Sequence, residues 1–167
     1  TTSEWVLALD ADEEVSEQLR VDIFNFFQGE HRRFNGALFP RKVWFLGRWI
    51  THGDWYPDLS LRLFRRGKGQ WSGSPEHDKI ELDGEAKRLA GDFHHYSHPT
   101  LNSYTAKIGV FSDYFLERQL AAGNRWSWTD CLLRPWWRFF RAYFLRRGFL
   151  DGFPGYYIAK ATAFSTL

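Results

Sequence analysis

With 167 residues the chain is long enough for one ordinary domain, and a hydrophobic content of 44% excludes wholesale disorder. A net charge of +2 excludes a strongly basic or acidic protein, although six arginines and a single acid lie between Arg125 and Arg147. The one cysteine, Cys131, excludes an internal disulfide and is typical of a reducing compartment.

The first 29 residues predict a strand, an acidic loop and a helix. Residues 5–9 (Trp-Val-Leu-Ala-Leu) are continuously apolar, which is typical of a buried central strand in a parallel sheet. The strand ends on the acidic residues 10 and 12–14. Ser16 can cap the following helix, whose apolar residues fall on one face and which Gly29 ends.

The middle of the chain favours strands and turns. We expect strands at residues 37–39 and 43–45, separated by Pro40, and a half-buried strand at 59–64, where apolar and polar residues alternate. Residues 79–82, the dipeptide Asp83-Gly84 and the residues from Glu85 onward predict a hairpin with a tight turn.

The last third of the chain is predicted to be helical. Apolar residues spaced by three and four predict a helix from residue 101 to about Gly123. A second helix is expected from Ser127 or Thr129 to Arg147, bent by Pro135, and a last apolar segment at residues 156–167. The prediction is therefore an α/β protein, with residues 1–98 as one part and the aromatic and arginine-rich residues 99–167 as a helical second part.

Asp10 and Asp12 are the first candidates for chemistry. Two carboxylates spaced by two residues at the carboxyl end of a parallel strand face the edge where open α/β sheets bind ligands. Mg²⁺ and Mn²⁺ prefer oxygen ligands and often bridge carboxylates to substrate phosphates. The pattern predicts a divalent metal and diphosphate site. A haloacid dehalogenase-type phosphatase also begins with Asp-x-Asp, but Glu13 and Glu14 follow here instead of a small pair.

Three further clusters carry side chains that are candidates for catalysis or binding. Glu76, His77 and Asp78 form one, in which Asp78 or Glu76 could take the proton of an acceptor hydroxyl. Residues 94–98 contain three histidines that could complete a metal site. In the third cluster aromatic rings suit sugar stacking and arginines suit phosphate, so the substrate-binding candidates are Trp55, Tyr56, Asp58, Arg62, Arg65 and, from the first cluster, His77.

Taken in order, these motifs resemble family 2 glycosyltransferases, and within them the lipopolysaccharide core glucosyltransferases. The motifs are Trp5-Val-Leu-Ala-Leu-Asp-Ala-Asp-Glu13, Trp44-Phe-Leu-Gly-Arg-Trp49, Gly53-Asp-Trp-Tyr-Pro-Asp58, Leu61-Arg-Leu-Phe-Arg65, His77-Asp78, His95-Tyr-Ser97, and Arg134-Pro-Trp-Trp-Arg-Phe-Phe-Arg-Ala-Tyr143 with the residues up to Gly155. The resemblance covers nearly the whole chain.

The resemblance implies a partial GT-A (Rossmann-like) fold with a mixed sheet, a nucleotide-sugar donor, a divalent metal (Mg²⁺ or Mn²⁺) and transfer with inversion. It implies that Asp10, Asp12 and His95 bind the metal. It also implies that Asp78 occupies the position of the catalytic base, where the branch usually has glutamate, with Glu76 as the rival. Such enzymes begin with a nucleotide-binding half that is absent here, so we expect this part to be inactive by itself.

The arginine- and aromatic-rich tail predicts an interfacial helix. Its membrane-facing candidates are Arg134, Trp136, Trp137, Arg138 and Arg141, whose rings and guanidinium groups suit headgroup depth and lipid phosphate. We therefore expect a lipid-linked or cell-envelope glycan acceptor, a peripheral position on the cytoplasmic face of the inner membrane, and no nucleic-acid partner. The alternative is a non-catalytic membrane- or nucleic-acid-binding module, which needs no metal and whose binding depends steeply on salt.

Overall fold

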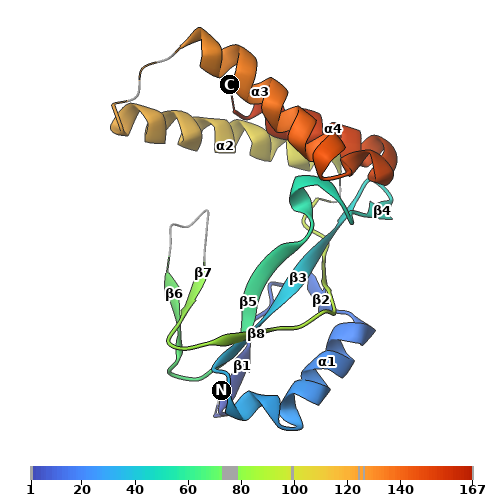
Figure 1. The fold of residues 1–167 in the computed structure, drawn as a ribbon, viewed down its shortest axis with the longest axis vertical. Coiled ribbons are helices and arrows are strands. Elements are labelled where there is room, and N and C mark those ends of the chain that lie inside the picture. The colour runs from blue at the N-terminus through green and yellow to red at the C-terminus, as the bar shows by residue number, and fades with distance from the viewer. Residues whose placement is uncertain (1, 73–78, 99, 124, 126, 167) are drawn as a thin grey trace. The chain divides into compact units, whose positions relative to one another are not determined.

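The computed structural model describes residues 2–72, 79–98, 100–123, 125 and 127–166 (Figure 1). The chain forms two compact units. The first comprises Thr1–Lys42 and Pro57–His95, and the second comprises Val43–Tyr56 and Tyr96–Leu167. Strands dominate the first unit and helices the second, so the α/β class is confirmed. The segment Val43–Tyr56, which the sequence analysis grouped with the strands, belongs to the helical unit.

A mixed sheet forms the first unit. Its strands run in the order β1-β5-β3-β9-β2, and β8 also pairs with β3. In the described residues, β1–β5, β3–β5 and β2–β9 pair antiparallel, and β3–β8 pairs parallel. The bounds are β1 Trp5–Leu7, β2 Glu13–Val15, β3 Gly36–Phe45, β5 Asp58–Arg65, β8 Ala86–Arg88 and β9 Phe93–His95.

The first strand differs from the prediction of a buried, parallel, central strand. β1 has three residues, is antiparallel to β5 and stands at one end of the order of described strands. Leu7 and Leu9 are exposed. An apolar run does not reveal the direction of its partner, and here the partner is the antiparallel β5. A further strand, β2, lies between the acidic turn and the helix that was expected to follow it directly.

Two other strand predictions were wrong. β3 is one continuous strand through Pro40, because the φ that proline imposes lies near the extended region and only one donor is lost. The predicted hairpin at residues 79–85 does not form. Instead β7 (Lys79–Leu82) pairs with β6 (Gly69–Ser72), and the chain turns at Gly84, whose φ is +119°, to enter β8. Asn35 holds this turn, since its side-chain amide donates to the carbonyl of Asp83 at 2.7 Å.

The helix predicted after Ser16 is confirmed as α1 (Glu17–Phe27), which packs against the sheet of the first unit (Figure 1). Ser16 caps it, with its hydroxyl accepting from the amide of Leu19 at 3.1 Å. Asp22 accepts from the amide of Gly91 at 2.8 Å and so fixes the chain before β9. The buried core between helix and sheet consists of Leu19, Phe26, Ala37, Phe39, Leu63, Leu89 and Phe93.

The second unit is built from helices. Helix α2 (Leu101–Ala121) confirms the helix predicted from residue 101 to about Gly123. The second was expected to reach Arg147, but α3 (Trp128–Phe140) ends earlier and continues as a π-helical turn, η3 (Arg141–Leu145). The remaining elements are β4 (Arg48–Trp49), the 3₁₀ turns η2 (Gly53–Trp55) and η4 (Gly148–Asp151), and α4 (Gly152–Phe164), while η1 (Glu30–Arg32) belongs to the first unit.

An aromatic core and a buried carboxylate hold the second unit together. The core consists of Phe45, Ile50, Tyr104, Ile158 and Ala161. Asp151 is fully buried, and its carboxylate accepts from the amides of Thr51 and His52 at 3.1 and 2.8 Å. In the described part of the chain, no helix combines the length and apolarity needed to cross a membrane.

Two helical glycines of the second unit should respond oppositely to alanine. A Cβ at Gly155 in α4 would overlap the carbonyl oxygen of Gly148, whereas a Cβ at Gly109 in α2 would meet nothing within 4 Å. We expect Gly155→Ala to lower the free energy of unfolding by about 1–3 kcal/mol through overpacking. We expect Gly109→Ala to raise it by up to about 1 kcal/mol, because alanine is the better helix former. Urea unfolding followed by circular dichroism measures both, and equal effects would contradict the packing of α4.

Candidate functional site

The acidic residues after β1 form a closed turn. The amide of Glu13 donates to the carbonyl of Asp10 at 3.1 Å, and the amide of Asp10 donates back to the Glu13 carboxylate at 3.0 Å. The turn is therefore secured through both its backbone and the side chain of Glu13. The side chains of Asp10 and Asp12 stay partly exposed, at 58% and 48%.

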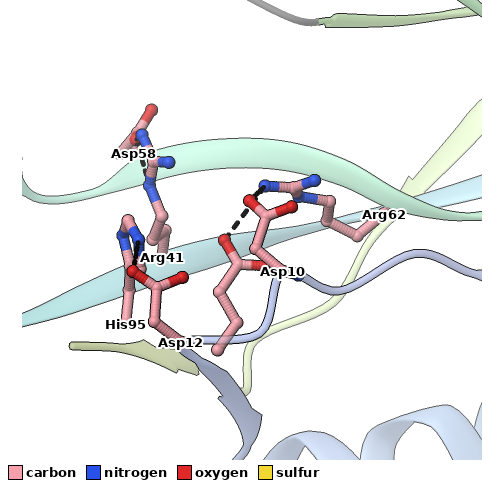
Figure 2. Close-up of polar contacts among 7 residues, drawn as sticks. Asp10, Asp12, Arg41, Asp58, Arg62 and His95 are labelled. Carbon is pink, nitrogen blue, oxygen red and sulfur yellow. Dashed lines mark hydrogen bonds and ion pairs between the residues drawn. The ribbon is translucent and has the colours of Figure 1, made fainter. Parts of the chain in front are cut away.

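Arg62 of β5 anchors the turn to the sheet (Figure 2). Its guanidinium donates to Asp10 and to Glu13, each at 2.9 Å. The Glu13 side chain is fully buried and that of Arg62 is 10% exposed. Burial raises the pKa of Glu13, while the amide of Asp10 and the charge of Arg62 oppose that rise. The pair is a buried, hydrogen-bonded contact that ties the acidic turn to β5.

Asp12 meets His95, the last residue of β9. The Asp12 carboxylate lies 3.3 Å from Nε2 of His95, and Glu13 is the register partner of His95 across the β2–β9 pair. Burial lowers the pKa of His95, the charge of Arg41 lowers it further, and Asp12 and Asp10 partly offset both. The imidazole is therefore biased toward its neutral form, which is the form that binds metal ions. Its Nδ1 is buried and makes no hydrogen bond to the described residues.

A second arginine, Arg41 of β3, borders this group. Its Nε donates to the Asp58 carboxylate at 2.9 Å, and a second guanidinium nitrogen contacts the same oxygen. Asp58, Arg41, His95 and Asp12 lie next to one another in Figure 2, beside the pair of Asp10 and Arg62. The site thus alternates carboxylates with cations.

Two atoms of this group, a carboxylate oxygen of Asp12 and Nε2 of His95, have a spacing that suits a divalent ion. Two neighbouring ligands of an octahedral ion with bonds of 2.0–2.1 Å stand about 3 Å apart, which is close to the 3.3 Å between Asp12 and His95. Asp10 is bound to Arg62 and would have to release it to join them. Among the described residues, no group of three or more His, Cys, Asp or Glu side chains is arranged to hold a metal. Asp12 and His95 thus offer two donor atoms at a suitable spacing, and these two alone do not make a metal site.

The other predicted site residues make different contacts or fall outside the described residues. Glu76, His77 and Asp78 are not described. Arg65 binds Glu4 at 2.9 Å, with its guanidinium 5.3 Å from the ring of Trp5. Trp55 and Tyr56 belong to the second unit, where Trp55 packs edge-on against Phe45 and Tyr104.

The tail residues divide into ion-paired arginines and exposed rings. Arg134 pairs with Asp130 at 2.8 Å, and Arg138 and Arg141 both pair with Asp54. Trp136 and Trp137 are 62% and 51% exposed.

Sequence reasoning missed two residues of the site. Glu13 looked like one more surface acid, and nothing in the sequence distinguishes it from the exposed Glu14. Arg41 follows Pro40 in a largely apolar stretch. A charged residue in this stretch was the one sequence feature that could have indicated a role for it.

Glu13 and Glu14 offer a matched pair of substitutions. Glu13→Ala removes a hydrogen-bonded partner of the mostly buried Arg62 and should lower the free energy of unfolding by about 1.5–3 kcal/mol. Glu14→Ala, at an exposed position of the same strand, should leave it nearly unchanged. Urea unfolding of the two variants tests the assignment, and an equal loss would contradict the buried role of Glu13.

Comparison with known proteins identifies relatives of one kind. No protein-family profile matches the chain. Proteins of Rickettsia typhi and Rickettsia prowazekii, both named as uncharacterised glycosyltransferases, are each 25% identical over 98% of the chain and 59% of their own length. The lipopolysaccharide core biosynthesis glycosyltransferase LpsC of Rhizobium meliloti is 24% identical over 95% of the chain and 62% of its own length.

These relatives confirm the resemblance to lipopolysaccharide core glycosyltransferases that the motifs predicted, over nearly the whole chain. The chain spans about three-fifths of the length of the curated relatives that it matches.

Proposed function

We propose that this chain belongs to an inverting glycosyltransferase that moves a sugar from a nucleotide-sugar donor to a lipid-linked or cell-envelope glycan. The observation that carries the proposal is the contact between Asp12 of the acidic turn and His95 at 3.3 Å, in a chain whose relatives are named glycosyltransferases. In this proposal Asp12 and His95, joined by Asp10, hold a divalent ion. The ion supplies charge neutralisation for the departing nucleoside diphosphate.

The residues of the chain take complementary roles in this proposal. Glu13 and Arg62 keep the acidic turn rigid while substrate exchanges. Arg41, whose side chain is 32% exposed, is available to a diphosphate oxygen. Asp78 takes the proton of the acceptor hydroxyl, with Glu76 as the rival. Asp58 is a weaker candidate for the base, because Arg41 already binds one of its oxygens.

The exposed rings of Trp136 and Trp137 support a peripheral association with the membrane that carries the acceptor. In bacteria with a lipopolysaccharide-like envelope, this corresponds to the cytoplasmic face of the inner membrane.

Metal binding should depend on Asp12 and His95. Titration of the purified chain with Mn²⁺, followed by electron paramagnetic resonance, should give an affinity that falls at least about tenfold in Asp12→Asn and in His95→Ala. Asp83→Asn is the control, because Asp83 is a well-exposed acid of the same unit that pairs with Lys68. Unchanged affinity in both site variants would exclude the proposed metal site.

Removal of the base should separate catalysis from binding. In the full-length protein, Asp78→Asn should lower turnover by about 10²–10⁴-fold while nucleotide-sugar affinity stays the same. Glu76→Gln and Asp58→Asn serve as comparisons under the same conditions. A severe loss in Glu76→Gln with little change in Asp78→Asn would transfer the role to Glu76.

The isolated 167-residue chain should not turn over any nucleotide sugar, because it spans only about three-fifths of the length of its relatives and we expect nucleotide binding to need the remainder. A coupled assay for nucleoside diphosphate release, run with Mn²⁺ and with Mg²⁺, measures this. Sustained release above the buffer rate would contradict the expectation.

A further inference from the structure

Three arginines of the helical unit converge on one carboxylate. Asp54, in η2, has a side chain that is 6% exposed. Nε of Arg138 lies 3.2 Å from it, Nη2 of Arg141 donates to both of its oxygens at 3.1 Å, and Nη1 of Arg146 lies 3.0 Å away. One negative charge against three positive charges leaves a local excess of two positive charges.

The geometry around Asp54 is held rigidly from both sides. The buried Asp151 fixes the preceding backbone at Thr51 and His52. The amide of Gly53 donates to the carbonyl of Arg146 at 2.9 Å, which ties η2 to the chain that follows η3. The three guanidinium groups are thus positioned in advance, and a ligand does not have to bear the full cost of ordering them.

The arginines keep surface and donors for a further anion. Their side chains are 39%, 32% and 50% exposed for Arg138, Arg141 and Arg146. Each guanidinium has five N–H donors, and Asp54 offers only two oxygens to all three. An oxyanion with several acceptor oxygens, such as phosphate, matches this surplus of donors.

Exposed apolar side chains accompany the arginines along α3 and η3, which follow one another in the chain. Trp136 stacks on Phe140 with centroids 5.4 Å apart, and Phe140 contacts Phe144 at the same distance. Leu133 and Trp137, at 61% and 51% exposure, precede Arg141 at spacings of eight and four. On a helix this spacing aligns them along one edge of the apolar face. We call Leu133, Trp136, Trp137, Phe140 and Phe144 the apolar arc.

We propose that Arg138, Arg141 and Arg146, organised by Asp54, bind the phosphate of an anionic phospholipid while the apolar arc enters the headgroup region. The adjoining apolar arc is the reason to assign the phosphate to a lipid, since a soluble phosphate gains nothing from exposed rings. The proposal deepens the membrane association proposed above, but it requires no sugar transfer.

Two substitutions, each removing one positive charge, test whether binding depends on the arginines held by Asp54 or on the basic surface in general. Co-sedimentation of the chain with phosphatidylcholine vesicles containing phosphatidylglycerol, at low salt, measures the partition coefficient. Arg146→Gln should lower it about fivefold or more, whereas Arg147→Gln, one residue away and without a contact to Asp54 among the described residues, should change it less than twofold. Equal losses would overturn the site, because a general basic surface responds to charge alone.

For Asp54→Asn, the two explanations predict opposite changes in binding to anionic vesicles. The substitution removes one negative charge and so makes the net charge more positive by one, and a general basic surface would bind anionic vesicles more tightly. A site organised by Asp54 would bind them more weakly, by about fivefold. Circular dichroism checks that each variant is folded, and if Asp54→Asn is not, the Arg146 and Arg147 pair decides the question alone.

Soluble competitors identify the source of the phosphate. Glycerol phosphate at constant ionic strength should bind at least about 100-fold more weakly than the vesicles, because it lacks the acyl chains. Equally tight binding of glycerol phosphate, or displacement from vesicles by a single-stranded oligonucleotide at equal charge concentration, would overturn the lipid assignment. Sugar transfer is tested separately, by turnover in the full-length protein. The lipid-binding proposal can therefore fail while the proposed sugar transfer stands, and the reverse.

Discussion

The candidate site depends on the hydrogen bonds from the guanidinium of Arg62 to Asp10 and Glu13. A buried cation is costly unless it is paired, and one guanidinium nitrogen of Arg62 donates to both Asp10 and Glu13, which lie at the two ends of one turn. This requirement fixes the turn against β5. It also fixes the start of β2, whose pairing with β9 brings His95 to Asp12. One buried charge therefore determines the relative positions of residues from three different strands and a turn.

The ion pairs around the acidic turn differ in their exposure to solvent. Asp10, which pairs with Arg62, and Asp58, which pairs with Arg41, are both roughly half exposed. Glu13 is fully buried, and separating it from Arg62 would leave an uncompensated charge. This division separates contacts that maintain the fold from contacts that are available to a ligand, within a single cluster of side chains.

The helical unit uses buried carboxylates in a similar way. Asp151 organises backbone amides, and Asp54 organises guanidinium groups. The consequences differ, because one arginine, Arg48 at 3.6 Å, faces Asp151, whereas three arginines face Asp54 and overcompensate its charge. The excess positive charge is held beside exposed aromatic rings. Arg138 and Arg141, which the sequence predicted to face the membrane, are joined by Arg146 around the single carboxylate of Asp54.

The sequence by itself determined the elements that depend on local patterns. Helices α1 and α2 follow from apolar spacing and from the Ser16 cap, and the prominence of Asp10 and Asp12 follows from their position after an apolar run. Only the tertiary structure decided which strands pair, because an apolar run carries no information about the direction of its partner. Nor could the sequence distinguish the buried Glu13 from the exposed Glu14, since that difference arises when Arg62 arrives from β5, 49 residues along the chain.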